Sequence, residues 1–200
     1  MLYHPDTVQT LTATPLGSVR LAASPLGLSG LWFEDQRHAP SAFWQGPTAW
    51  PLAPQHALLR EAAQQLQQYF DGRRTAFALP LDLSGGTPFQ QAVWRALLAL
   101  RAGSTTSYGA LSRVIDRPRA VRALGSAVGR NPLSIVVPCH RVVGADGTLT
   151  GYAGGLARKQ HLLALEGVQH GVQHGVPPAP SHAPAPAART ASRPRAGLLA

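Results

Sequence analysis

Residues 107–130 read SYGALSRVIDRPRAVRALGSAVGR and predict two short helices separated by a turn. Ser107 is a typical helix-capping residue, and Leu111 falls one helical turn further on. The Asp116–Arg117 pair interrupts the pattern, and Pro118 is a residue that commonly opens a helix. Two short helices joined by a tight turn follow the order of a helix-turn-helix.

The second of these helices, residues 118–130, presents two different faces on a helical wheel. One face is apolar and suits packing against the preceding helices: Val121, Leu124 and Val128. The opposite face carries Arg119, Arg122, Ser126 and Arg130. Gly125 and Gly129 each destabilise an isolated helix by about 1 kcal/mol relative to alanine, so they predict close packing or close approach. A small, basic face of this kind fits DNA phosphates and the minor groove.

The charge of the chain is basic and unevenly distributed. Eighteen Lys and Arg residues stand against nine Asp and Glu residues, which gives a formal net charge of +9. Between Arg101 and Arg141 there are seven arginines and a single acidic residue, Asp116. This clustering is what a polyanion-binding surface needs, although a solvated basic face has the same composition.

Three zones of different composition predict an α+β protein with two domains and a tail. Residues 1–84 predict a small α/β domain, with strands in TVQTLTA (7–13), GSVRLAA (17–23), LGLSGLWF (26–33) and FALPLDL (77–83), and a helix in HALLREAAQQLQQYF (56–70). Residues 85–167 predict a mostly helical domain, whose first helix begins at a capping box of Thr87 and Gln90 and continues to Gly103. Residues 168–200 contain six prolines and no acidic residue, which predicts a disordered tail.

The composition also argues against several classes of protein and site. No segment approaches the roughly 20 consecutive apolar residues of a membrane-spanning helix. The N-terminal residues lack the pattern of a signal peptide. The single cysteine, Cys139, forms no internal disulfide and no Cys-rich zinc site, and no histidine pair has metal-ligand spacing such as HxxxH on a predicted helix. We expect a soluble, cytoplasmic protein without a metal or another cofactor.

Cys139 lies in the stretch IVVPCHRVVG, residues 135–144, and these residues alone leave its role open. Pro138 cannot donate to a sheet ladder, so we expect a strand through 135–137 to end there and to leave the thiol on a turn. His140 and Arg141 create an electropositive setting, which favours the nucleophilic thiolate. Neighbouring side chains usually diverge, however, so a Cys–His contact needs a bridging water or a curved turn. A reactive cysteine and a small buried hydrophobic residue both fit.

Four motifs in a fixed order resemble the methylated-DNA–protein-cysteine methyltransferases (6-O-alkylguanine-DNA alkyltransferases). They are TPFQQAVWRAL (87–97), TTSYGAL (105–111), RAVRALGSAVGRNP (119–132), and PCHRVVG (138–144) followed by GYAGGLARKQHLLALEG (151–167). The resemblance is strong over residues 79–167, weaker in PLGSVRLAASPLGLSGLWF (15–33), and does not extend into the tail. It implies an RNase H-like N-terminal domain followed by a mostly helical domain with a helix-turn-helix.

The resemblance implies a division of labour at the acceptor site. Cys139 is expected to take the alkyl group. His140 is expected to draw the proton from the thiol through a water, and Glu166 to orient and polarise His140. Asn131 is expected to order the turn that leads to the site.

It also implies contacts to an extruded base. Tyr108 matches the tyrosine that hydrogen-bonds the flipped base and hands a proton to the departing guanine oxygen. Arg122 matches the arginine that fills the gap left in the duplex, which offsets part of the cost of extrusion. The pocket lining is expected to include Val142, Tyr152, Gly151 and Ala153. Ala153 departs from the serine of some members, so a hydroxyl contact there is missing.

Together these residues imply DNA repair by direct reversal. A methyl or alkyl group would pass irreversibly and stoichiometrically from O6 of guanine, with O4 of thymine as a further candidate, to Cys139. The expected partner is double-stranded DNA containing alkylated guanine, and the expected form is a monomer. One alternative is a non-catalytic module that binds alkylated DNA and needs no acceptor cysteine. Another is a cysteine hydrolase that turns over small esters or peptides.

Overall fold

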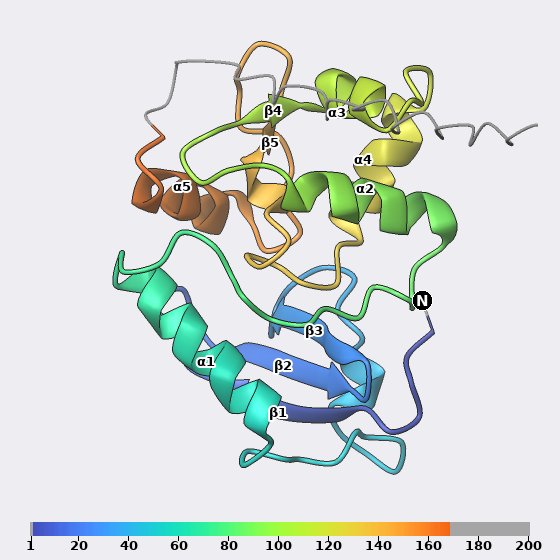
Figure 1. Ribbon diagram of the computed structural model, residues 1–200, viewed down its shortest axis with the longest axis vertical. Helices are drawn as coiled ribbons and strands as arrows, with labels where there is room; N and C mark the ends of the chain where they lie inside the picture. The colour runs from blue at the N-terminus through green and yellow to red at the C-terminus, as the bar shows by residue number, and fades with distance from the viewer. Residues whose placement is uncertain (1, 169–200) are drawn as a thin grey trace, which may run out of the picture.

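The computed structural model describes residues 2–168, and the predicted tail lies outside them except for Val168. The N-terminal half is an antiparallel sheet in the order β1-β2-β3 with a helix against it (Figure 1). Its elements are β1 (Val8–Thr12), β2 (Val19–Ser24), β3 (Gly27–Phe33), the 3-10 turn η1 (Ser41–Phe43) and α1 (Ala57–Phe70). The first three predicted strands and the helix are therefore confirmed.

The predicted strand at residues 77–83 is wrong, because this segment pairs at one point only. Leu81 forms an isolated bridge with Leu28 of β3, with Leu28 N donating to Pro80 O (2.8 Å) and Asp82 N donating to Leu28 O (2.9 Å). Pro80 has no N–H to donate, so a regular ladder does not continue through it.

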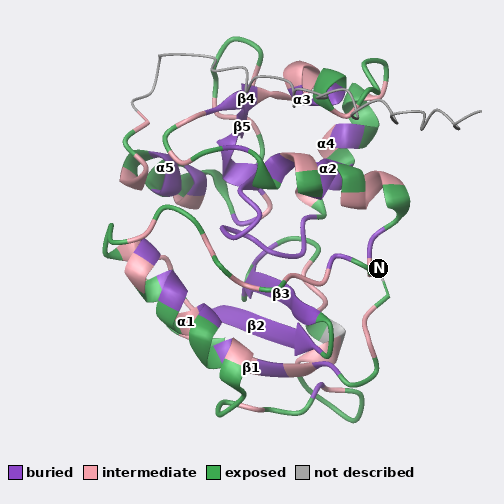
Figure 2. Ribbon diagram, in the orientation of Figure 1, coloured by how far each residue is buried: buried purple, intermediate pink, exposed green. Residues whose placement is uncertain are grey.

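The sheet buries both of its faces, as Figure 2 shows for β2 and β3. Alternate residues of a strand point to opposite faces. Leu21 and Leu31 belong to the main core together with Leu59 of α1. Trp32 points the other way, into an aromatic cluster that includes Tyr3 and Trp50.

The C-terminal half is mostly helical. It contains α2 (Pro88–Leu98), β4 (Thr106–Ser107), α3 (Tyr108–Val114), α4 (Val121–Gly129), η2 (Cys139–Arg141), β5 (Val142–Val143) and α5 (Leu156–Leu165). The short strands β4 and β5 pair in parallel. Within residues 2–168, every helix is too short or too polar to cross a membrane.

The predicted start of α2 is confirmed, but its predicted end is wrong. The Thr87 side chain accepts a hydrogen bond from Gln90 N (3.3 Å), and Gln90 Oε1 accepts one from Thr87 N (2.9 Å), which completes the capping box. The helix stops at Leu98 rather than near Gly103. Leu100 falls three residues after Leu97, at helical spacing, but it lies beyond the end of the helix and is buried all the same. Its spacing therefore reflects burial rather than helical structure.

Helices α3 and α4 are the two predicted short helices, and residues 115–120 join them. Ser107 caps α3 by accepting a hydrogen bond from Ala110 N (3.1 Å), and Asp116 turns the chain with a positive φ of 56°. Helix α4 begins three residues after Pro118, because residues 118–120 belong to the turn. Leu124 and Val128 are buried as predicted, whereas Val121, in the first turn of α4, is 39% exposed.

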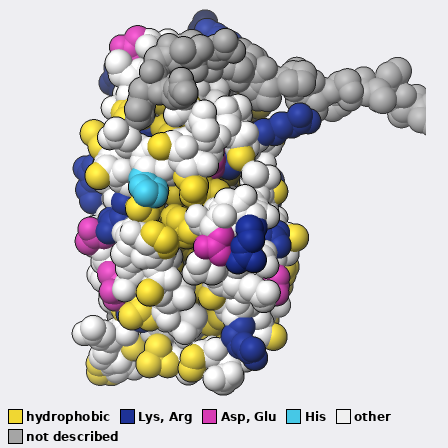
Figure 3. Space-filling model, turned by 90° about the vertical axis from the view of Figure 1, so that its left-hand side faces the viewer, with side chains coloured by type: hydrophobic (Ala, Val, Ile, Leu, Met, Phe, Trp, Pro, Cys, Tyr) yellow, Lys and Arg dark blue, Asp and Glu magenta, His cyan; other side chains and the backbone are white. Residues whose placement is uncertain are grey.

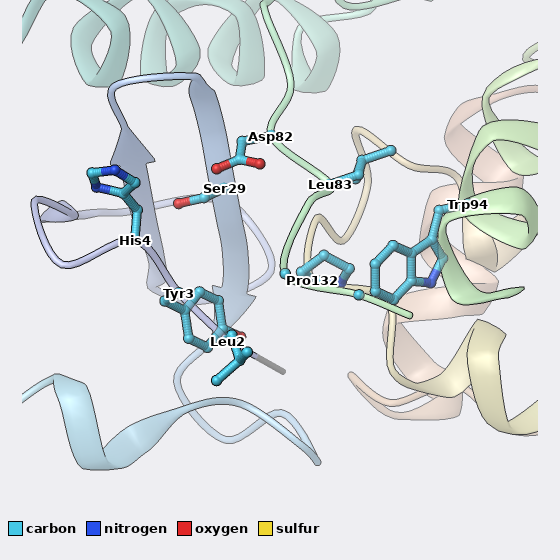
Figure 4. A pocket seen from close by; sticks show the side chains of 10 residues that line it. Leu2, Tyr3, His4, Ser29, Asp82, Leu83, Trp94 and Pro132 are labelled. Atoms are coloured by element: carbon cyan, nitrogen blue, oxygen red, sulfur yellow. The ribbon is translucent and has the colours of Figure 1, made fainter. Parts of the chain in front are cut away.

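The two halves meet along a seam. The outer edge of β3 bonds to the C-terminal half, with Leu31 N donating to Pro132 O (2.8 Å) and Ser134 N donating to Leu31 O (3.0 Å). A cavity of about 10 Å³, room for about one water molecule, lies at this seam between Tyr3 and Trp94 (Figure 4). Hydrophobic side chains gather at mid-height on the face shown in Figure 3. One core cluster contains buried side chains of both halves, so the halves are joined by backbone pairing and by apolar packing.

Candidate active site

Cys139 begins the 3-10 turn η2 and is 6% exposed. The strand predicted for residues 135–137 is wrong, because this segment is a tight turn in which Ile135 has a φ of 70°. The backbone N–H of Val137 donates to Leu133 O (2.8 Å), and that of Cys139 donates to Val137 O (2.8 Å). The thiol does lie on a turn, as expected after Pro138, but the turn is buried rather than exposed.

Asn131 holds this turn with its side-chain amide. Its Nδ2 donates to Val137 O (2.8 Å) and to Cys139 Sγ (3.0 Å), while its Oδ1 accepts from Leu133 N (3.0 Å). Asn131 is itself buried. One side chain therefore orders the backbone ahead of the cysteine and also fixes the position of the sulfur.

The imidazole of His140 pairs with a buried carboxylate. Its Nε2 lies 2.9 Å from Glu166 Oε1, and the imidazole is fully buried. An ionised carboxylate only accepts hydrogen bonds, so Nε2 carries the proton and Nδ1 of the neutral ring keeps its lone pair. Among the described residues His140 Nδ1 has no hydrogen-bond partner, and Cys139 and His140 do not bond to each other directly.

Arg141 pairs with the same carboxylate in a bidentate arrangement. Its Nε donates to Glu166 Oε2 (2.8 Å) and its Nη2 to Glu166 Oε1 (2.8 Å), while Nη1 donates to Leu100 O. Glu166 directly follows α5, and its side chain is 2% exposed. The fork geometry of a guanidinium on a carboxylate restricts the rotation of both groups.

The environment shifts the pKa of each group in the cluster. Burial raises the pKa of the Cys139 thiol, and the hydrogen bond from Asn131 and the charge of Lys159 offset only part of that increase. Burial lowers the pKa of His140 more than the Glu166 carboxylate raises it. Burial alone would raise the pKa of Glu166, but the hydrogen bonds and charges of His140 and Arg141 bring it to about 2.

The raised pKa of Cys139 corrects one expectation about this residue. Flanking cationic residues were expected to favour the thiolate, yet burial outweighs them and the thiol is the resting form. A neutral imidazole beside an ionised carboxylate is the form of histidine that can accept a proton. The site therefore holds a neutral thiol and a neutral imidazole whose Nδ1 is able to accept a proton.

A cavity of about 290 Å³ opens above Cys139. Seven of the predicted site residues line it: Tyr108, Ser126, Arg130, Cys139, Gly151, Tyr152 and Ala153. Gly125 and Gly129 of α4 also line it, and a Cβ added at Gly129 would meet no heavy atom within 4 Å. The predicted close approach therefore corresponds to open space at Gly129, whereas a Cβ at Gly125 would lie 3.8 Å from the Tyr108 ring.

The remaining predicted residues lie elsewhere. Asn131, His140 and Glu166 do not line the cavity; their side chains are buried members of the hydrogen-bond network just described. Val142 does not line the cavity. It is fully buried in β5, where it pairs with Thr106. Arg119 and Arg122 are exposed, outside the cavity lining.

Several residues at the site were not predicted from the sequence. Arg37 and His38, from the loop after β3, line the cavity although they belong to the N-terminal half. Lys159 is fully buried and donates from Nζ to Val142 O and to Thr150 O (2.7 Å). Tyr69 of α1 donates from its hydroxyl to Glu166 Oε1 (2.7 Å).

The signals for these residues differ in strength. Lys159 is the one lysine in a chain whose other basic residues are arginines, which was a usable hint. Burial lowers the pKa of its ammonium to about 8. Nothing in the local sequence around Tyr69 or Arg37 connects either residue to the site. Among the described residues, no group of His, Cys, Asp and Glu is arranged to hold a metal ion.

Comparison with known proteins covers both halves of the chain. Residues 7–83 match the 6-O-methylguanine DNA methyltransferase ribonuclease-like domain, and residues 88–168 match the DNA binding domain of the same methyltransferase. The chain is similar to the methylated-DNA–protein-cysteine methyltransferase of Mycobacterium leprae, with 46% identity over 76% of this chain and 88% of the relative. The corresponding values for the enzyme of Mycolicibacterium paratuberculosis are 48%, 76% and 88%.

A solved structure gives the same result. The crystal structure of Mycobacterium tuberculosis OGT in complex with DNA superimposes with a TM-score of 0.69 and 44% identity, over 78% of this chain and 90% of that one. The expected α+β class, with a ribonuclease-like N-terminal domain and a helical DNA-binding domain, is confirmed. The chain belongs to the methylated-DNA–protein-cysteine methyltransferase family and is an enzyme of that kind.

Proposed function

We propose that this protein repairs DNA by moving a methyl or larger alkyl group from O6 of guanine to Cys139, once per molecule. The observation that carries the proposal is the buried array in which Asn131 holds the sulfur and His140 is paired with an ionised Glu166. Cys139, the member of this array that lines the cavity, borders a space of about 290 Å³, large enough for a purine. O4 of thymine is a second possible donor position.

The reaction requires one proton transfer and one displacement. The thiol proton passes to His140 Nδ1, which has a free lone pair, through a water between the two groups. The sulfur then attacks the alkyl carbon, the S–C bond forms, and the C–O bond to guanine breaks. Tyr108, on the cavity wall, donates a proton to the departing oxygen. The thioether that remains on Cys139 is a poor leaving group, so the step is irreversible and needs no cofactor.

We propose that the chain has two domains and that one of them binds DNA. Residues 1–84 form the N-terminal domain and residues 85–167 the domain that binds DNA and accepts the alkyl group. Helix α4, with the exposed Arg119, Arg122 and Arg130 at or beside it, faces the duplex, and Arg122 fills the gap left by the extruded nucleotide. Val142, Tyr152, Gly151, Ala153 and Ser126 border the extruded base. A cytoplasmic location and a monomeric state stay predictions.

The test is the intact mass of the protein after mixing with duplex DNA that contains O6-methylguanine. The wild-type chain should gain the mass of one methylene and no more, and peptide mapping should assign it to Cys139. Cys139→Ala should gain nothing while it still binds the duplex. Methyl transfer that survives Cys139→Ala would falsify the proposal.

The same experiment separates the rival functions. A non-catalytic module that binds alkylated DNA predicts binding without any mass gain in the wild-type chain. A cysteine hydrolase predicts repeated turnover of a small ester such as p-nitrophenyl acetate, beyond one equivalent of product per protein.

A further inference from the structure

The carboxylate that orients His140 is held from both halves of the molecule. Glu166 follows α5 in the C-terminal half, and Tyr69 lies near the end of α1 in the N-terminal half. Figure 1 shows these two helix ends on the same side of the molecule, and the Tyr69 hydroxyl donates to Glu166 Oε1 over 2.7 Å. Both side chains are 2% exposed, so water does not compete for this bond.

Three donors converge on the single oxygen that faces His140. Glu166 Oε1 accepts from Tyr69 (2.7 Å), from Arg141 Nη2 (2.8 Å) and from His140 Nε2 (2.9 Å). A carboxylate oxygen has two in-plane lone pairs, so three donors must share them. Each donor withdraws negative charge from the oxygen, and the phenol therefore competes with the imidazole for that charge.

The ring of Tyr69 fills space in the core, whereas its hydroxyl makes a specific hydrogen bond to Glu166. The ring packs against Phe70 and Phe77, with centroids 5.5 and 5.6 Å away, and a phenylalanine would fill the same space. A buried hydroxyl is costly unless it is hydrogen-bonded, and Glu166 is the partner it has among the described residues. Burial, together with the Glu166 charge, raises the pKa of Tyr69, so the hydroxyl remains a donor throughout the working pH range.

We propose that Tyr69 is a positioning residue of the alkyl-acceptor site, through which the N-terminal half fixes Glu166 Oε1 and limits the negative charge that this oxygen presents to His140. The inference rests on the proposed function, since it assigns Tyr69 to the array that deprotonates Cys139. It makes the N-terminal half a contributor to the chemistry as well as a scaffold.

The proposal predicts a direction of change. Without the hydroxyl, Oε1 presents more charge to His140 and stabilises its protonated form, so the pKa of His140 rises. Protonated His140 cannot accept the thiol proton, and the acid limb of the reaction profile therefore moves to higher pH. A carboxylate that has lost one restraint also orients His140 less well, and we expect the rate on the plateau to fall about 3- to 10-fold.

The experiment uses full-length Tyr69→Phe and two probes, each measured from about pH 5 to about pH 9. One probe is methyl transfer from O6-methylguanine duplex DNA, and the other is alkylation of Cys139 by iodoacetamide. Both acid limbs should move upward relative to wild type. Iodoacetamide needs neither DNA nor guanine, so it reports on Tyr69 even if the wild-type chain transfers no methyl group and the proposed function fails.

Two further variants keep the result decisive. Tyr3→Phe is the matched control, because Tyr3 belongs to the aromatic cluster of the N-terminal half and should leave both profiles unchanged. Ring-fluorinated tyrosine at position 69 keeps the ring and the hydrogen bond but donates more strongly, so it should move the limbs downward. The proposal is overturned if the profiles of Tyr69→Phe and of the fluorinated variant coincide with wild type, or if Tyr3→Phe shifts them equally.

Discussion

Arginines in the C-terminal half serve two opposite purposes. Arg141 is 5% exposed and satisfies its guanidinium on Glu166 and on a backbone carbonyl. Arg119, Arg122 and Arg130 are exposed and form no ion pair within residues 2–168. A buried guanidinium organises the protein itself, whereas an exposed and unpaired one remains available to an anion from outside. The same residue type therefore holds the buried cluster beside Cys139 in one place and, in the other, forms the surface that we propose faces DNA.

The largest effect on the unfolding free energy should come from replacing Arg141, the buried arginine of this comparison. Arg141→Met leaves Glu166 without its bidentate partner in a buried setting, and breaking such a pair costs about 3 kcal/mol or more of unfolding free energy. The matched change Arg122→Met, on the exposed surface, should stay within about 0.5 kcal/mol of wild type. Urea unfolding of the three proteins measures both values. Equal losses would remove the distinction between the two kinds of arginine.

Acid should weaken the buried cluster selectively. The pKa of Glu166 is about 2 in the folded protein against an ordinary value of 4.5, so the folded state favours the ionised form. Its stabilisation is complete above about pH 5 and is lost as the pH falls from 4.5 toward 2, with a total of about 3 kcal/mol. The lowered pKa of His140 acts in the same direction, because this residue is neutral in the fold and must be charged on acid unfolding, beginning below about pH 6.5.

Unfolding free energies between neutral pH and about pH 3 measure this loss. The exposed Asp71→Asn variant is the control, because Asp71 pairs with Arg73 at the surface and should leave the pH dependence almost unchanged. A wild-type protein whose stability stays flat down to pH 3 would contradict the assignment of an ionised, hydrogen-bonded Glu166.

The smallest effect should come from replacing Arg122 on the exposed surface. It should appear only in the rate of reaction with duplex DNA. Arg122→Ala should slow methyl transfer from O6-methylguanine in a duplex about 10-fold, a loss of about 1.4 kcal/mol. Reaction with the free base O6-benzylguanine should be unchanged, because that substrate needs no extrusion. Rate constants on the two substrates, measured side by side, sharpen the comparison. Equal losses on both would argue that Arg122 acts within the pocket rather than on the duplex.

Local signals predicted most of the elements because local energetics decide them. The capping box at Thr87, the cap at Ser107 and the alternating strands of the N-terminal half depend on residues within one turn or one strand of each other. One error arose where that condition fails, and another overlooked a local signal. Residues 135–137 have strand-like composition but are gathered into a turn by Asn131, and residues 77–83 contain a proline that interrupts pairing.

The identity of the acceptor site could also be predicted, since Cys139, His140, Asn131, Glu166 and Tyr108 lie in motifs that resemble one family. Their roles stay predictions, but their convergence is a matter of geometry. Val142 was expected at the pocket wall and lies in the core instead, where its carbonyl accepts from Lys159. Residues from the N-terminal half, such as Arg37 at the cavity, had no local signal at all.

The sequence by itself determined the family to which this protein belongs, because its cysteine, histidine, carboxylate and arginine-bearing helix follow one another in a recognisable order. Only the tertiary structure decided the protonation states and the partners of those groups. Burial makes the thiol rather than the thiolate the resting form, against the expectation from its cationic neighbours. Tyr69 and Glu166, 97 residues apart, meet because the fold brings the ends of α1 and α5 to the same side of the molecule. Desolvation and contacts between distant residues arise only in the folded core, so the spacing of residues along the chain does not predict them.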